Sequence, residues 1–133
     1  LDICHSVHDA IAYEPFTTDN NTTAAEVMQQ RKGVCQDMAH LMISLCRMRG
    51  ITARYVNGFL DGTGVTHAWV EVACTDAPST VWIGFDPTHD RLIDYGYIKL
   101  AHGRDASDCT VNRGTYLGNV AQQTQTLVTV KEI

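Results

Sequence analysis

The spacing of hydrophobic positions changes near the middle of the chain, from a helical period to a strand period. Between Cys35 and Arg49 apolar residues recur every three or four positions, which predicts a helix that ends at Gly50. Apolar side chains also occupy a second side of this segment, so we expect a central and largely buried helix. The main apolar stripe consists of Met38, Leu41, Met42, Leu45 and Met48.

Two shorter helices are expected before this segment. The pattern favours one helix over residues 2–13 and, after a polar loop over 15–21, a second helix that runs to Gln30. The second helix begins at the tetrapeptide Thr23-Ala24-Ala25-Glu26, which matches a capping box. In that motif the threonine oxygen accepts a backbone N–H bond and the glutamate reaches back to the threonine N–H. Gly33 then separates this helix from the central one.

After Gly50 the apolar period becomes two, which is typical of β-strands. A glycine-rich turn over 61–64 separates the first two expected strands, and Pro87 ends the third. The expected helices come first, and the expected strands that follow can be connected by turns into an antiparallel sheet. This order of elements predicts the α+β class, with the central helix packed on the sheet. The expected strands cover 52–60, 66–74, 80–86, 97–102 and 124–130.

Length and composition indicate one globular domain spanning residues 1–133. The chain is 44 % apolar and 19 % charged, and its net charge is −5. Without a cluster of basic residues, we expect neither a nucleic-acid partner nor a membrane-surface role. No apolar stretch is long enough to span a bilayer. The chain starts without Met or a signal pattern, so we expect it to be the C-terminal part of a longer protein with a further N-terminal region.

The five cysteines are an odd number and form no CxxC pair. This spacing argues against a disulfide framework and against a zinc ribbon. It favours a reducing compartment, and therefore a cytoplasmic location. The sequence contains no recognisable cofactor motif, and we expect no metal and no cofactor.

Cys35 lies where the central helix is expected to begin. Free backbone N–H groups and the helix dipole favour a thiolate at such a position, and the thiolate is the nucleophilic form of cysteine. A buried free cysteine that only packs is the ordinary alternative.

His67 and Asp86 are expected to face each other across a hairpin. His67 begins one predicted strand and Asp86 ends the next, and a loop over 74–79 would set the two residues directly opposite each other. The carboxylate could then accept the imidazole N–H and fix the orientation of the ring. We expect a register shift of two residues to separate the pair.

Four ordered motifs resemble the transglutaminase-like superfamily, most closely its bacterial members described as cysteine proteases. They are Gly-Val-Cys-Gln-Asp at 33–37, Arg-Gly-Ile-Thr-Ala-Arg-Tyr-Val at 49–56, His-Ala-Trp-Val-Glu-Val at 67–72 and Trp-Ile-Gly-Phe-Asp-Pro-Thr at 82–88. The resemblance implies a papain-like fold in which Cys35, His67 and Asp86 form a catalytic triad. The chain departs from the pattern at His89-Asp90, where relatives often carry Asn-Gly.

The implied chemistry is acyl transfer on a peptide or protein amide through a thioester on Cys35, most simply completed by water. Protein-glutamine transamidation is the alternative. The backbone N–H of Cys35 suits an oxyanion donor, with Tyr13 and Gln36 as candidates for a second donor. Trp69 shares the strand face of His67 and is a candidate to shield the site, while His89 is expected at the surface. The sequence specifies neither the substrate nor the oligomeric state.

Two further alternatives belong to other functional classes. The first is a non-catalytic interaction module on the same fold, because a fold alone does not determine function. The second is a metal site built from Cys35 and His67 with Cys74 or His89, although these spacings match no common zinc pattern.

Overall fold

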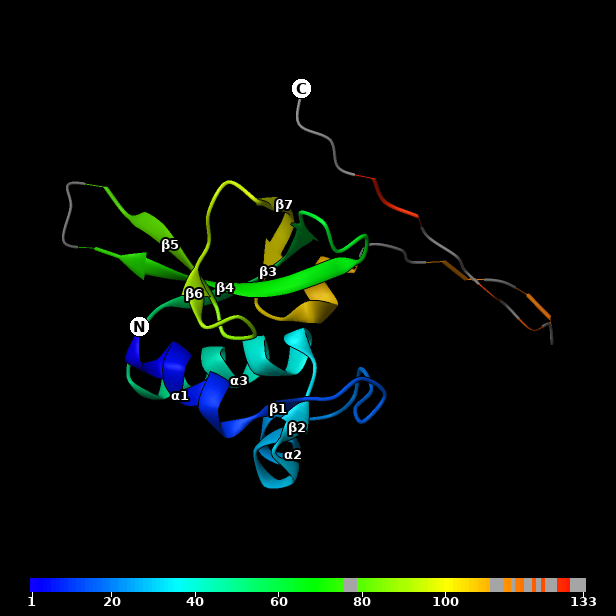
Figure 1. The fold of residues 1–133 in the computed structure, drawn as a ribbon, viewed down its shortest axis with the longest axis horizontal. Helices are drawn as coiled ribbons and strands as arrows, with labels where there is room; N and C mark the ends of the chain where they lie inside the picture. The colour runs from blue at the N-terminus through cyan, green and yellow to red at the C-terminus, as the bar shows by residue number, and fades with distance from the viewer. Residues whose placement is uncertain are drawn as a thin grey trace.

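The computed structural model describes residues 1–75, 79–110, 114–115, 117–118, 121, 123 and 127–129. Helices lie against one face of a five-stranded sheet (Figure 1). This arrangement is the predicted α+β architecture. In chain order the elements are α1 (Asp2–Ala10), β1 (Ala12–Tyr13), α2 (Ala24–Gln30), β2 (Lys32–Gly33), α3 (Cys35–Met48), β3 (Ala53–Leu60), β4 (Thr66–Cys74), β5 (Val81–Asp86), β6 (Arg91–Leu92), β7 (Tyr97–Gly103) and the 3-10 helix η1 (Ala106–Cys109).

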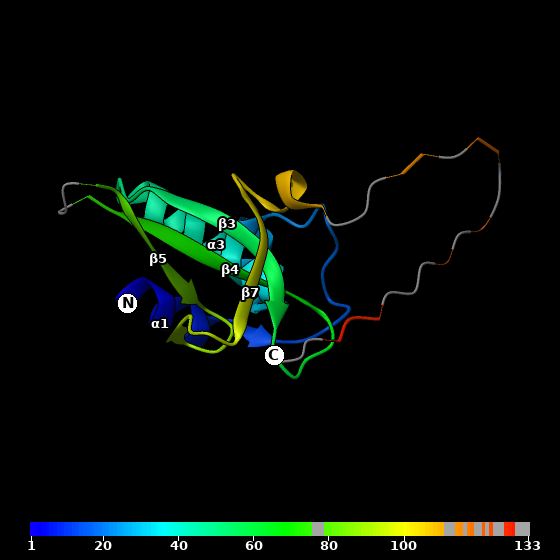
Figure 2. The same ribbon diagram turned by 90° about the horizontal axis from the view of Figure 1, so that it is seen from above.

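The central helix α3 is largely buried, as predicted, and packs between the sheet and the other helices (Figure 1). Seen from above, it lies beneath β3 and β4 (Figure 2). Its apolar side chains join those of α1, α2, β3 and β4 in one core, because the helix is apolar around most of its circumference. The buried α3 residues are Asp37, Met38, Ala39, Leu41, Met42, Ile43 and Cys46. Within the described part of the chain, no helix is long and apolar enough to cross a membrane.

The main sheet has the strand order β6-β5-β4-β3-β7, and all neighbouring strands are antiparallel. The strands predicted over 52–60, 66–74, 80–86 and 97–102 are confirmed to within one residue at each end. The strand predicted over 124–130 falls mostly outside the described residues, and 127–129 belong to no strand. The capping box that starts α2 is also confirmed, with Thr23 and Glu26 bonded reciprocally.

The helix predicted over residues 2–13 is too long. α1 ends at Ala10, and the following residues form β1, which pairs in parallel with β2. Ala12 donates to the carbonyl of Arg31 and Glu14 donates to the carbonyl of Gly33, each at 2.9 Å. A helical apolar pattern cannot reveal this pairing, because the partner strand is distant in sequence. The pairing brings Tyr13 next to the start of α3.

The predicted register between β4 and β5 is wrong by two residues. Val70 pairs with Phe85 and Cys74 with Val81, whereas the predicted register would pair Cys74 with Ser79. Continuing this register puts Asp86 opposite Trp69. A shift of two keeps every side chain on its face of the sheet, and diagonal neighbours are still within reach of long side chains. Asp86 therefore still contacts His67, contrary to the expected separation.

Gly58 allows β7 and Trp69 to approach β3 closely. The β3–β7 register shifts between Asn57 and Gly58. A Cβ atom at Gly58 would lie 2.1 Å from the carbonyl oxygen of Ile98 and 2.5 Å from the Trp69 ring. Such distances are far below van der Waals contact, and one of the two obstacles is backbone. Glycine is therefore required at this bulge.

We predict that Gly58→Ala lowers the free energy of unfolding by about 1–3 kcal/mol, because the new methyl group forces β3 and β7 apart. Urea denaturation measures the change. Gly114→Ala serves as the matched control, because an added Cβ there meets no atom within 4 Å. Equal stabilities of the two variants would contradict the tight approach at Gly58.

Candidate active site

Cys35 is the first residue of α3 and is half-buried. The turn before it is held by Asp37, whose Oδ2 accepts the Val34 N–H at 2.8 Å and the Thr18 hydroxyl at 2.6 Å. A Cβ at Gly33 would meet the Asp37 side chain at 2.9 Å, so glycine makes room for this carboxylate. The helix start that carries Cys35 is thus fixed by a buried side chain.

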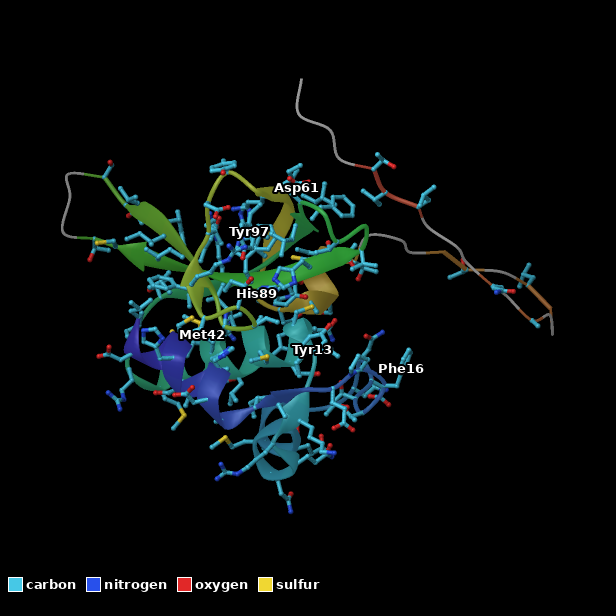
Figure 3. The ribbon with its side chains drawn as sticks, viewed as in Figure 1. Tyr13, Phe16, Met42, Asp61, His89 and Tyr97 are labelled. Carbon is cyan, nitrogen blue, oxygen red and sulfur yellow. The ribbon has the colours of Figure 1, made fainter. Side chains whose placement is uncertain are left out.

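Tyr13 and Gln36, the two candidates for a second oxyanion donor, have different surroundings. Tyr13 is paired with Gly33 through β1 and β2 and remains 56 % exposed. Burial of its ring and the negative charge of Cys35 raise the pKa of Tyr13, so its hydroxyl stays protonated. Figure 3 shows Tyr13 beside α3, whereas Phe16 projects into solvent. Gln36 lines a cavity along α3.

His67 is buried near the beginning of β4, and its Nε2 lies 2.7 Å from Asp86 Oδ2. This contact leaves Nδ1 as the ring nitrogen available to Cys35. Trp69 lies beside the imidazole, with ring centroids 6.3 Å apart, and only 1 % of it is exposed. Trp69 therefore supports the His67 ring from within the protein, and its burial keeps it away from any substrate in this conformation.

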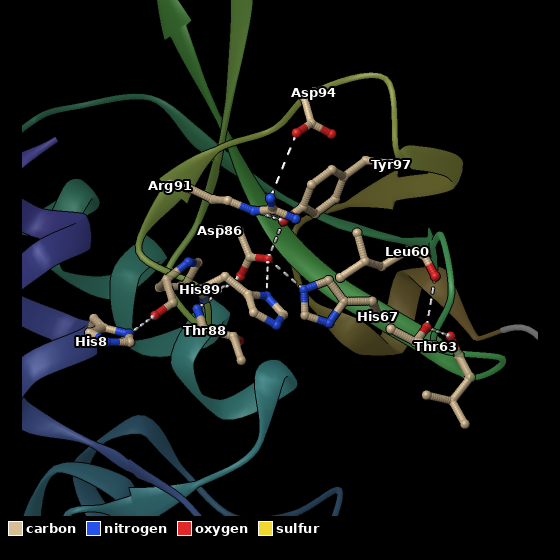
Figure 4. Close-up of polar contacts among 12 residues, drawn as sticks. His8, Leu60, Thr63, His67, Asp86, Thr88, His89, Arg91, Asp94 and Tyr97 are labelled. Carbon is tan, nitrogen blue, oxygen red and sulfur yellow. Dashed lines mark hydrogen bonds and ion pairs between the residues drawn. The ribbon is translucent and has the colours of Figure 1, made fainter.

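Asp86 is the last residue of β5 and is fully buried. Its Oδ2 accepts hydrogen bonds from His67 Nε2, His89 Nδ1 and the Tyr97 hydroxyl, each at 2.7 Å (Figure 4). Its Oδ1 accepts the backbone N–H groups of Thr88 and His89 at 2.8 and 3.3 Å. A buried carboxylate needs such donors, because an unpaired charge in the interior is costly.

These contacts set the protonation of the site. Burial alone would lower the pKa of His67, but hydrogen bonds to Asp86 and Cys35 and the charges of both side chains raise it to about 9. Burial alone would raise the pKa of Asp86, but His67, Tyr97 and His89 hold it well below its usual range. Burial and the carboxylate raise the pKa of Tyr97, so its hydroxyl remains a donor. The arrangement favours a charged imidazole beside an ionised carboxylate.

The turn that follows Asp86 is held from the opposite layer by α1. His8 Nδ1 lies 3.2 Å from the carbonyl oxygen of Pro87, and His5 pairs with Asp90. These contacts, one of which Figure 4 shows, bind the α1 helix to the turn that carries the aspartate. The first helix therefore contributes to the position of Asp86 without reaching the reacting atoms.

Two residues of the site were not expected from the sequence. His89 was predicted at the surface, and its side chain is 44 % exposed, but its Nδ1 contacts Asp86. A donor three residues after an aspartate in a turn is a local signal that could have indicated it. Tyr97 comes from β7, and no local pattern connects it to Asp86.

His67, Asp86 and His89 also resemble a set of metal ligands. Among the described residues, one ligand atom from each lies within 4.8 Å of the others. This set differs from the metal alternative considered from the sequence, because it does not use Cys35 or Cys74. The hydrogen bonds that both imidazoles make to Asp86 Oδ2 account for the close approach without an ion.

Comparison with known proteins places this geometry in a family. A protein from Cytophaga hutchinsonii, described with its crystal structure as a proposed cysteine protease, superposes with a TM-score of 0.72 at 36 % identity. The superposition covers 83 % of this chain and 37 % of that one. Calcium-bound LapG from Legionella pneumophila matches with a TM-score of 0.59 at 12 % identity, over 77 % of this chain and 64 % of LapG, which shows a shared fold only.

Sequence comparison agrees with the structural match. An uncharacterized protein from Mycobacterium tuberculosis is 35 % identical over 130 residues, which cover 89 % of this chain and 41 % of that protein. The chain thus spans less than half the length of this curated relative. The model of the transglutaminase-like superfamily matches residues 1–87, which include all three proposed triad residues. The chain therefore belongs to the transglutaminase-like superfamily.

Proposed function

We propose that the chain is the catalytic core of a cysteine hydrolase that cleaves a peptide or protein amide through a thioester on Cys35. The observation that carries this proposal is the convergence of three elements: Cys35 begins α3, His67 lies on β4, and Asp86 at the end of β5 binds the imidazole at 2.7 Å. Nucleophile, base and orienting carboxylate are the parts that covalent acyl transfer needs. The match to the transglutaminase-like superfamily and the structural similarity to the Cytophaga hutchinsonii protein support this proposal.

In the first step the Cys35 sulfur attacks the amide carbon and forms a tetrahedral oxyanion. The backbone N–H of Cys35 is one donor to this oxygen, and we assign the second to the exposed Tyr13 hydroxyl. The C–N bond then breaks as the imidazolium of His67 gives its proton to the leaving amine. Asp86 keeps the ring oriented and stabilises its positive charge.

In the second step a water molecule attacks the thioester. His67 accepts the water proton, and the acid and the Cys35 thiol are released. We favour water over an amine as the acceptor, because Cys35 is only half-buried, so solvent reaches the thioester. Transamidation of protein glutamine uses the same first step, and products formed with added amine distinguish the two reactions.

The reactivity of Cys35 toward iodoacetamide distinguishes the proposed hydrolase from a non-catalytic interaction module. We expect iodoacetamide to label Cys35 rapidly even in mildly acidic solution, because the imidazolium of His67 stabilises a thiolate. His67→Ala should remove this fast labelling. Peptide mass spectrometry measures each site, and the half-buried Cys74 is the matched internal control. Labelling of Cys35 that rises only in alkaline solution, like that of Cys74, would favour the interaction module.

The His67 imidazole should titrate with a pKa of about 9, measured by NMR of its ring protons. Because this value lies above the ordinary 6.5, the charged ring stabilises the fold below pH 6.5, and this contribution is lost as the pH rises through 9. Asp86→Asn removes the carboxylate charge, so we expect a lower pKa of His67. An unchanged His67 titration in that variant would rule out Asp86 as its partner.

Tyr97 should act as a positioning residue for Asp86. We expect Tyr97→Phe to lower the free energy of unfolding by about 1.5–3 kcal/mol, because it removes a hydrogen bond to a buried charge, and to slow the labelling of Cys35. Tyr95→Phe is the matched control, since Tyr95 is fully exposed two residues away. Urea denaturation and labelling kinetics measure both effects, and identical behaviour of the two variants would argue against the role.

A further inference from the structure

A polar cavity runs along one side of the catalytic helix. Its volume is about 680 Å³, within the range of ligand-binding pockets. The α3 residues that line it are Gln36, His40, Ile43, Ser44 and Arg47, which recur every three or four positions and so form one stripe of the helix. The stripe begins one residue after the nucleophile. We call this cavity the α3 groove.

The opposite walls of the α3 groove come from segments far apart in the sequence. Residues 20–24, which lead into α2, form one wall, and residues 104–107, with 109 and 110, form the other. Figure 2 shows the segment before α2 and the helix η1 on the same side of the sheet, beside α3. The floor includes Tyr55 and Asn57 of β3. The groove is therefore built from four elements around the start of α3.

Polar groups in the floor and wall of the groove are left without partners in the described part of the chain. Tyr55 lines the groove and is 3 % exposed, and its hydroxyl makes no hydrogen bond to another residue of the described part of the chain. Burial, and after it the negative charge of Cys35, raises the pKa of Tyr55, so its hydroxyl stays protonated and can donate a hydrogen bond. The Gln36 amide likewise has no side-chain partner. A ligand that carries amide groups could satisfy both.

The charged groups of the groove are already engaged within the protein. Arg104 binds Asp108 through two nitrogens, at 2.9 and 3.0 Å. Arg47 donates to the carbonyl oxygen of Arg104, and Asp105 accepts from Ser107 at the start of η1. His40 accepts the N–H of Ala106 at 3.0 Å, so that nitrogen of the ring is unprotonated. The groove is polar but suits an uncharged ligand better than an ion.

The length of the groove suits an extended chain. Gln36 and Arg47 are separated by three turns of α3, about 16 Å along the helix axis. An extended polypeptide advances about 3.3 Å per residue, so about five residues fit in this length. A small amide bound at Cys35 would leave most of the groove empty.

We propose that the α3 groove binds an extended segment of a polypeptide substrate next to the bond that Cys35 attacks. The inference rests on the proposed hydrolysis and narrows its substrate class from amides in general to polypeptides with at least several unstructured residues beside the cleavage point. Backbone amides of the bound segment supply the partners for Tyr55 and Gln36. Side chains along the groove then select polar, uncharged residues.

The groove can be blocked without touching the triad. Ser44→Trp fills it from α3, and Asn21→Trp fills it from the opposite wall, where the side chain is exposed. Met48→Trp is the matched control, because Met48 is on the same helix, is 82 % exposed and lies outside the groove. Two blocking variants from different walls keep the test decisive if one of them fails to fold.

Binding is measured by fluorescence polarisation with fluorescein-labelled fragments of denatured casein, in the Cys35→Ala background so that no cleavage occurs. We expect long fragments to bind and tripeptide fragments not to. Ser44→Trp and Asn21→Trp should each weaken the binding of long fragments by about tenfold, equivalent to about 1.4 kcal/mol, and Met48→Trp should leave it unchanged. Equal binding by all variants would overturn the proposal.

The experiments can contradict the proposed peptide groove and the proposed hydrolysis independently of each other. If the unmodified protein cleaves no fragment but groove-blocking variants lose binding, the peptide groove stands and the proposed hydrolysis fails. If the protein cleaves casein fragments and tripeptide amides with the same kcat/KM, and Ser44→Trp changes neither, the hydrolysis stands and the groove is not a substrate site.

Discussion

The buried carboxylate of Asp86 is the constraint on which the rest of the site depends. An ionised group with no exposure is tolerated only where donors replace water, and five donors surround this one. They come from β4, from the turn after β5 and from β7, so the charge can be satisfied only when these segments are assembled. The same contacts keep the carboxylate ionised and the imidazole of His67 charged. The requirement to bury Asp86 and the requirement to orient His67 are met by one set of hydrogen bonds.

The nucleophile reaches this centre from the other layer of the molecule. Cys35 is positioned by the backbone at the start of α3, and that start is held by Asp37 and by the short β1–β2 pairing. The sheet supplies His67, with Trp69 packed beside its ring. Catalytic geometry therefore depends on how the helical layer packs against the sheet, which is a property of the whole core. The contacts of α1 with the turn after Asp86 strengthen this connection between the layers.

The proposed peptide groove, like the triad, is formed by segments that are far apart in the sequence. It follows the stripe of α3 that begins beside Cys35, and η1 and the segment before α2 enclose it. The Mycobacterium tuberculosis and Cytophaga hutchinsonii proteins that align with this chain are each more than twice its length. The α3 stripe of this groove begins at Gln36, one residue after Cys35, and its length suits about five extended residues.

The sequence by itself determined the central helix and the main strands, and it pointed to the candidate reacting groups. The period of three to four residues around Met38 and Leu41 predicted α3, the period of two predicted the main strands, and the four motifs pointed to Cys35, His67 and Asp86. These are local signals, since each needs only neighbouring residues. The tertiary structure alone decided the β4–β5 register, the β1–β2 pairing, the role of Tyr97 and His89 at Asp86, and the α3 groove. Each of these joins segments distant in sequence, and such contacts depend on how the whole core packs, which no local pattern records.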